Sequence, residues 1–99
     1  MTFGLNPEDF KTFQTLVVNP LKRAGFKLYV FGSRVTGKNH PFSDIDVLLE
    51  PEASAQMNVL SDVKEKIEAA RFPIKVDFVI FSELAESYRE RVNKEKILV

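Results

Sequence analysis

The stretch that decides the fold is FGSRVTGKNHPFSDIDVLL, residues 31–49, in which a Gly-Ser turn and a polar loop separate two apolar runs. The second run opens with two acids, Asp44 and Asp46. Side chains alternate between the faces of a β-strand, so these acids share one face while Ile45 and Val47 point to the other. The pattern predicts a strand that buries its apolar residues and presents two carboxylates on its opposite face.

The same stretch has the features of a phosphate site. Carboxylates two residues apart on a strand lie about 7 Å from each other and repel unless a cation sits between them. Gly32 and Ser33 follow the first apolar run, and a glycine, which has no Cβ, lets backbone amides approach a phosphate closely. A divalent metal facing such a turn indicates nucleotide chemistry.

The composition limits the other possibilities. The chain has 99 residues, 44% hydrophobic and 28% charged, and we expect a single domain over residues 1–99. The 14 basic and 14 acidic residues balance, which argues against bulk electrostatic binding of nucleic acid. The absence of cysteine excludes disulfides, thiolate zinc sites and a cysteine nucleophile. No segment resembles a signal peptide or a membrane span, and we expect a cytoplasmic protein.

Alternating helical and extended patterns predict an α/β (α+β) fold, with helices packed on a small mixed β-sheet. Asn6 and Pro7 form a cap and first-turn pair for the first helix, which Asn19-Pro20 should bend or break. A helical turn can follow Ser33, and the last helix starts near Ser82. The remaining predicted elements are strands over 27–31, 44–49 and 74–81 and a helix over 53–71.

A third acid, Asp77, lies in the last predicted strand. Its neighbours there are mostly apolar, and we expect that strand in the middle of the sheet, where an unpaired charge is costly. Asp77 either occupies an exposed face, where it costs little, or lines up beside Asp44 and Asp46. In the second case a metal would neutralise all three, and magnesium prefers oxygen ligands that it shares with substrate phosphates.

The order of these features resembles the minimal nucleotidyltransferases, small members of the DNA polymerase beta-like nucleotidyltransferase superfamily. Their signature begins Gly-Ser, continues through a second Gly, ends in Ser-Asp-x-Asp, and is followed by a third Asp on a later strand. Here the signature runs from Gly32 to Asp46, with Asp77 as the third acid. Many relatives carry Ala-Arg where this chain has Val35 and Thr36. The resemblance covers residues 27–81 and implies the minimal nucleotidyltransferase fold.

The resemblance also implies roles for individual residues. Three acids would be catalytic and would hold two magnesium ions: Asp44, Asp46 and Asp77. ATP would be the substrate, and four residues would bind the nucleotide: Gly32, Ser33, Arg34 and Lys38.

A reaction and a partner follow from the same resemblance. It implies a magnesium-dependent enzyme that transfers AMP from ATP to a hydroxyl of a partner protein. Such a chain is similar to the antitoxin of pairs whose toxin is an all-helical HEPN-type protein. Two alternatives stay open: a non-catalytic antitoxin that blocks its partner by contact alone, and a small-molecule nucleotidyltransferase of the aminoglycoside-modifying kind. The presence of all three acids favours catalysis over contact alone.

The C-terminal part of the chain carries less information. The mixed charges from Glu83 to Lys96 indicate a solvated helix face. Residues 97–99, Ile-Leu-Val, either contribute to a partner contact or pack on the core of the chain itself.

Overall fold

A mixed four-stranded sheet organises the molecule. The computed structural model describes all residues, 1–99, and its strands lie in the order β3-β2-β1-β4. The central pair, β1 (Phe26–Phe31) and β2 (Ile45–Pro51), is antiparallel. On the outer sides, β3 (Val76–Ile80) runs parallel to β2, and β4 (Ile97–Leu98) runs antiparallel to β1. The predicted mixed sheet with packed helices is therefore confirmed.

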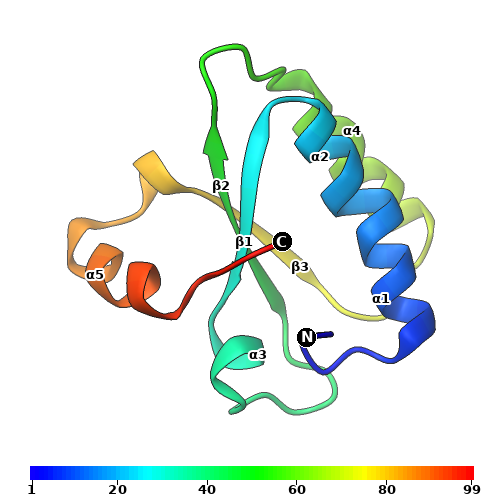
Figure 1. The fold of residues 1–99 in the computed structure, drawn as a ribbon. Helices are drawn as coiled ribbons and strands as arrows, with labels where there is room; N and C mark the ends of the chain where they lie inside the picture. The colour runs from blue at the N-terminus through cyan, green and yellow to red at the C-terminus, as the bar shows by residue number, and fades with distance from the viewer.

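Helices cover both faces of this sheet unequally (Figure 1). Helices α1, α2 and α4 lie together on one side, and α5 lies on the other. The short α3 follows β1 directly, and a 3₁₀ turn follows β3. The helical bounds are α1 Pro7–Phe13, α2 Asn19–Arg23, α3 Ser33–Thr36, α4 Asn58–Ala69, the 3₁₀ turn Phe81–Glu83 and α5 Glu86–Glu95.

Of the predicted bend or break at Asn19-Pro20, the break does not occur, because the chain stays helical from Pro7 to Arg23. Asn6 caps this run as expected, its side-chain oxygen accepting the Asp9 amide at 2.7 Å. A π-helical segment, Gln14–Val18, joins α1 to α2, and the Asn19 amide donates to the carbonyl of Gln14 five residues back. Proline has no amide hydrogen to continue an α-helical ladder, and the wider turn before it absorbs the mismatch.

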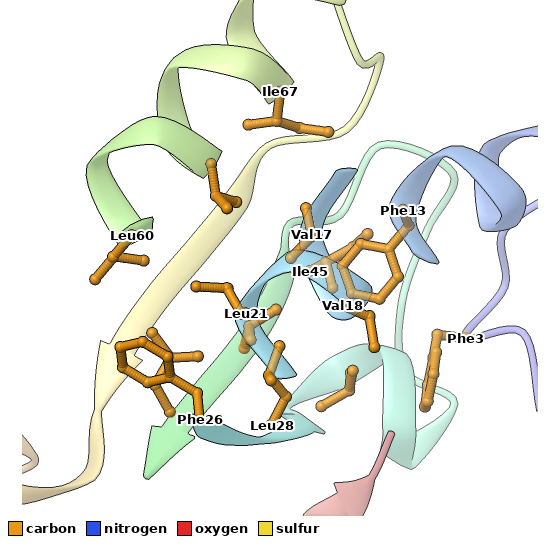
Figure 2. Packing of buried hydrophobic residues seen from close by; sticks show 14 of the residues in the cluster. Phe3, Phe13, Val17, Val18, Leu21, Phe26, Leu28, Ile45, Leu60 and Ile67 are labelled. Atoms are coloured by element: carbon orange, nitrogen blue, oxygen red, sulfur yellow. The ribbon is translucent and has the colours of Figure 1, made fainter. Parts of the chain in front are cut away.

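The main core lies between the sheet and the three helices on one side of it (Figure 2). Ile45 and Val47 are fully buried there, as the alternation of β2 predicts. Each such side chain contributes about 1.5–3 kcal/mol on burial. The other fully buried members of this cluster include Phe13, Val17, Leu21, Leu28, Val30 and Leu49.

The start of α4 differs from the prediction, which placed a helix over 53–71. The preceding residues instead form turns that pack on the end of α2. The Gln56 amide donates to the Ala24 carbonyl at 2.8 Å, and the Glu52 amide donates to the Gly25 carbonyl at 2.9 Å. These bonds hold the segment in a non-helical path until Asn58. None of the helices combines the length and apolar character needed to cross a membrane.

The position of β3 also corrects an expectation. We predicted this strand in the middle of the sheet, but it lies at the edge, and Asp77 is exposed. The middle positions belong to β2 and β1, because the C-terminal β4 pairs with the free side of β1. Residues 97–99 thus pack on the sheet of the chain itself, with the Val99 amide donating to the Leu28 carbonyl at 3.0 Å.

Candidate functional site

The sheet brings two of the predicted acids side by side. In the parallel register of β2 and β3, Asp46 is paired with Asp77, so both carboxylates stand on the same face in adjacent strands. On its other side Asp46 is paired with Phe31, the last residue of β1. Asp44 lies just before β2 and is exposed. The row therefore runs from the end of β1 through Asp46 to Asp77.

Asp46 is the electrostatic centre of this row. It is half-buried, and burial is the largest cause that raises the pKa of its carboxyl to about 6. The negative charges of Asp77, Asp44 and Glu95 raise it further, in that order. Because all three neighbours act in the same direction, the site favours any cation that reaches Asp46, whether a proton or a metal.

The turn after β1 requires glycine for a reason that the sequence does not reveal. Gly32 is buried, with φ 83° and ψ −157°, a conformation that side-chain-bearing residues rarely adopt. A Cβ built on Gly32 would collide with Oδ2 of Asp46. Glycine therefore allows the turn and the carboxylate of Asp46 to touch.

The short helix α3 sets the residues that follow this turn. The amides of Val35 and Thr36 donate to the Gly32 carbonyl at 3.0 and 3.1 Å. Ser33 is half-buried at the start of α3, next to Gly32. Lys38 lies exposed beyond the end of this helix, and its amide donates to the Ser33 carbonyl at 3.1 Å. Ser33 is thus beside the acid row, whereas no hydrogen bond or ion pair fixes the Lys38 side chain.

Arg34 differs from its predicted role, because its side chain points into the protein. It is only 4% exposed, and its guanidinium donates to three carbonyls, those of Phe3, Pro41 and Ser43, at 2.9, 3.1 and 2.9 Å. Burial lowers the pKa of Arg34, and the nearby charge of Asp44 partly offsets this effect. These contacts assign Arg34 to bracing the loop before β2 against the N-terminal segment.

Two hydrogen bonds within the loop before β2 hold its ends together. The Ser43 hydroxyl accepts the amide of His40 at 2.9 Å, and the Ser43 amide donates back to the His40 carbonyl at 3.0 Å. Together with Arg34, this turn fixes the chain immediately before Asp44. The backbone that carries Asp44 is therefore held in place by these contacts.

A further acid, Glu95, reaches the site from the end of α5. Its Oε1 accepts the amide of Gly32 at 2.9 Å, and its Oε2 lies 3.8 Å from Nε of Arg91. The Glu95 side chain is 15% exposed. The prediction of a solvated face from Glu83 to Lys96 is therefore wrong at this residue, although it fits Glu90 and Lys94, which are exposed and paired at 3.3 Å.

The residues after Glu95 anchor it on the sheet. The ammonium of Lys96 lies 3.4 Å from Oε1 of Glu50 and 4.2 Å from the centre of the Tyr29 ring. Ile97 then pairs with Val30 in the antiparallel register of β4 and β1. The only sequence signal for this arrangement is the apolar run at 97–99, which draws the end of α5 back to the sheet.

The donor set at the acid row fits a hard divalent cation, because it consists of carboxylate oxygens that repel one another. No three Asp, Glu, His or Cys side chains come close enough to hold a metal ion on their own. Magnesium often takes one or two carboxylates and completes its coordination with water and substrate phosphates. Asp46 with Asp77 or Asp44 suits that kind of shared site.

Comparison with known sequences gives a family match. Residues 26–99 match the family model described as polymerase beta, nucleotidyltransferase. A Haemophilus influenzae protein named "probable protein adenylyltransferase MntA" is 27% identical over 94 residues, which span 92% of this chain and 82% of that protein.

Two solved structures are similar to this chain. One, described as a minimal nucleotidyltransferase, has a TM-score of 0.72 and 27% identity and covers 96% of this chain and 97% of its own. The other, a toxin-antitoxin crystal structure with AMP-PNP, has a TM-score of 0.63 and 19% identity and covers 86% and 70%. At that identity the second likeness concerns the fold alone.

Proposed function

The chain belongs to the polymerase beta nucleotidyltransferase family, and on this basis we propose that it transfers AMP from ATP to a hydroxyl group of a partner protein. The observation that supports this proposal most directly is the register of β2 and β3, in which Asp46 and Asp77 are neighbours. The Gly32 turn lies against the same carboxylate of Asp46. A triphosphate on this turn would bring its α-phosphorus next to the acids.

The proposed reaction is a nucleotidyl transfer. The acceptor oxygen forms a bond to the α-phosphorus, the bond from that phosphorus to the bridging oxygen of the β-phosphate breaks, and pyrophosphate leaves with the bonding electrons. The acceptor proton passes to solvent. Asp44, Asp46 and Asp77 would hold two magnesium ions, which would lower the pKa of the attacking hydroxyl and neutralise charge on the phosphates.

In this proposal, exposed groups at and after the turn bind the nucleotide. The first amides of a helix have no partner within it, so those at the start of α3 can donate to phosphate oxygens together with the Ser33 hydroxyl. Lys38 is exposed and can add its positive charge. Arg34 is left out of the proposed set because its guanidinium is buried and donates to three backbone carbonyls.

The acceptor is proposed to arrive on another molecule. Asp77 is exposed on the edge strand β3, and Asp44 is exposed just before β2, so this side of the row is accessible to a large partner. The similarity to a protein named as a protein adenylyltransferase favours a protein acceptor and adenine as the base. We propose an all-helical HEPN-type partner, with this chain as its antitoxin.

The test is transfer of label from α-labelled ATP, with magnesium, to a purified HEPN-type protein from the same genome. Asp44→Ala and Asp46→Ala should each abolish labelling, and Ser33→Ala should reduce it by about one to three orders of magnitude, as for a lost oriented donor. Asp62→Ala, on the exposed side of α4, is the matched control and should label normally. Full neutralisation of the partner by the double variant Asp44→Ala, Asp46→Ala would favour inhibition by contact and refute the enzymatic proposal.

A further inference from the structure

We propose that Glu95 is a positioning residue that fixes the Gly32 turn for the nucleotide phosphates. This inference rests on the proposed function and adds to it a residue from the far end of the chain. The Gly32 amide donates to Oε1 of Glu95 at 2.9 Å, across a separation of 63 residues in sequence. The phosphates themselves would then be bound by the amides and hydroxyl that follow Gly32.

The need for this contact comes from the burial of the turn. Gly32 is buried, and a buried amide without a partner destabilises the conformation that contains it. The turn also has the unusual dihedral angles φ 83° and ψ −157° and lies against the carboxylate of Asp46. Glu95 supplies the partner, and a hydrogen bond to a carboxylate is among the stronger kinds.

The backbone that carries Glu95 is held in place. Lys96 is bound to Glu50 and lies over the Tyr29 ring, and β4 then pairs with β1. Figure 1 shows this C-terminal segment crossing beside β1 after α5 ends. A carboxylate on such a fixed backbone can set the orientation of a turn. A carboxylate that blocks the phosphate site and leaves when the nucleotide binds would need a mobile backbone.

The opposite role is the natural competitor. A carboxylate on a turn amide carries the same sign of charge as a phosphate, so Glu95 could occupy the phosphate site and hinder binding. The two roles predict opposite effects of removing the side chain. Loss of a positioning residue weakens nucleotide binding, and loss of a blocking carboxylate strengthens it.

The experiment measures magnesium-ATP binding by calorimetry in wild type and in three variants of Glu95. Glu95→Gln keeps an oxygen acceptor and should bind ATP within about threefold of wild type or more tightly. Glu95→Ala should bind roughly tenfold or more weakly, the fold-change for about 1.4 kcal/mol. Glu95→Asp, one methylene shorter, should resemble alanine and replaces it if the alanine variant fails to fold. Glu90→Gln is the control, an exposed acid in the same helix.

A second readout follows the contact without nucleotide. The chain has 4 glycines, so the Gly32 amide is readily assigned in a ¹H–¹⁵N spectrum. Its proton should shift upfield in Glu95→Ala and less in Glu95→Gln, while the Gly25 and Gly37 signals stay in place. An unchanged Gly32 signal, tight binding by Glu95→Ala, or failure of glutamine to rescue binding would each overturn the proposal. Absence of ATP binding by wild type would instead refute the proposed function.

Discussion

Replacing Gly32 with alanine tests the contact between the turn and the acid row. The backbone at this position costs a side-chain-bearing residue about 1–3 kcal/mol. The new Cβ would also collide with Oδ2 of Asp46, and displacing a packed side chain costs about 1–3 kcal/mol more. We therefore expect Gly32→Ala to lower the free energy of unfolding by about 2–6 kcal/mol, a large part of the 5–15 kcal/mol that is usual for a domain.

Two companion variants separate these effects in urea unfolding. Gly37→Ala is the control: its φ of 80° is also positive, but its Cβ would meet nothing within 4 Å, so we expect a loss of about 1–2 kcal/mol. The double variant Gly32→Ala, Asp46→Ala removes the obstructing carboxylate. It should recover about 1–3 kcal/mol relative to the sum of the single variants. Additive losses within about 0.5 kcal/mol would refute the claim that Asp46 is what excludes a side chain at residue 32.

Four further predictions concern charge, metal and the braced loop. The pKa of the Asp46 carboxyl is raised from 3.8 to about 6, so between these pH values the folded state binds more protons than the unfolded state. The free energy of unfolding should therefore fall as the pH rises from about 4 to about 6. Asp46→Asn should remove this pH dependence, and an unchanged profile in that variant would contradict the assignment. Asp77→Asn should be neutral or stabilising without metal yet inactive in transfer, since it removes a repelling charge; a loss above about 2 kcal/mol would instead make Asp77 a structural hydrogen-bonding residue. Manganese should bind more tightly with ATP than alone, and calorimetry on Asp44→Asn, Asp46→Asn should show that binding lost. Arg34→Ala should cost about 2–4 kcal/mol in thermal or urea unfolding because three carbonyls lose their donor, and a loss under about 1 kcal/mol would return Arg34 to the list of ligand-binding candidates.

Much of the fold follows from patterns that act over a few residues. The alternation from Ile45 to Val47 determined which side of β2 faces the core, because successive side chains on a strand point to opposite faces. Asn6 determined the start of α1, because an asparagine side chain can satisfy a free amide of the first turn. The Gly-Ser turn and the two acids likewise indicated a candidate site, because a glycine turn and two neighbouring carboxylates both lower stability.

Contacts between distant parts of the chain decided the rest. Glu95 looks like any other charge of an exposed helix until β4 pairs with β1 and brings it to Gly32, 63 residues away in sequence. Arg34 follows a phosphate-type turn, yet the carbonyls of Phe3, Pro41 and Ser43 take its donors once the N-terminal segment folds over it. The position of β3 at the sheet edge likewise depends on the last strand pairing with β1 and not with β3. Local periodicity specifies which face of an element is apolar, but the order of strands and the partner of each buried donor depend on packing that only the folded chain brings about.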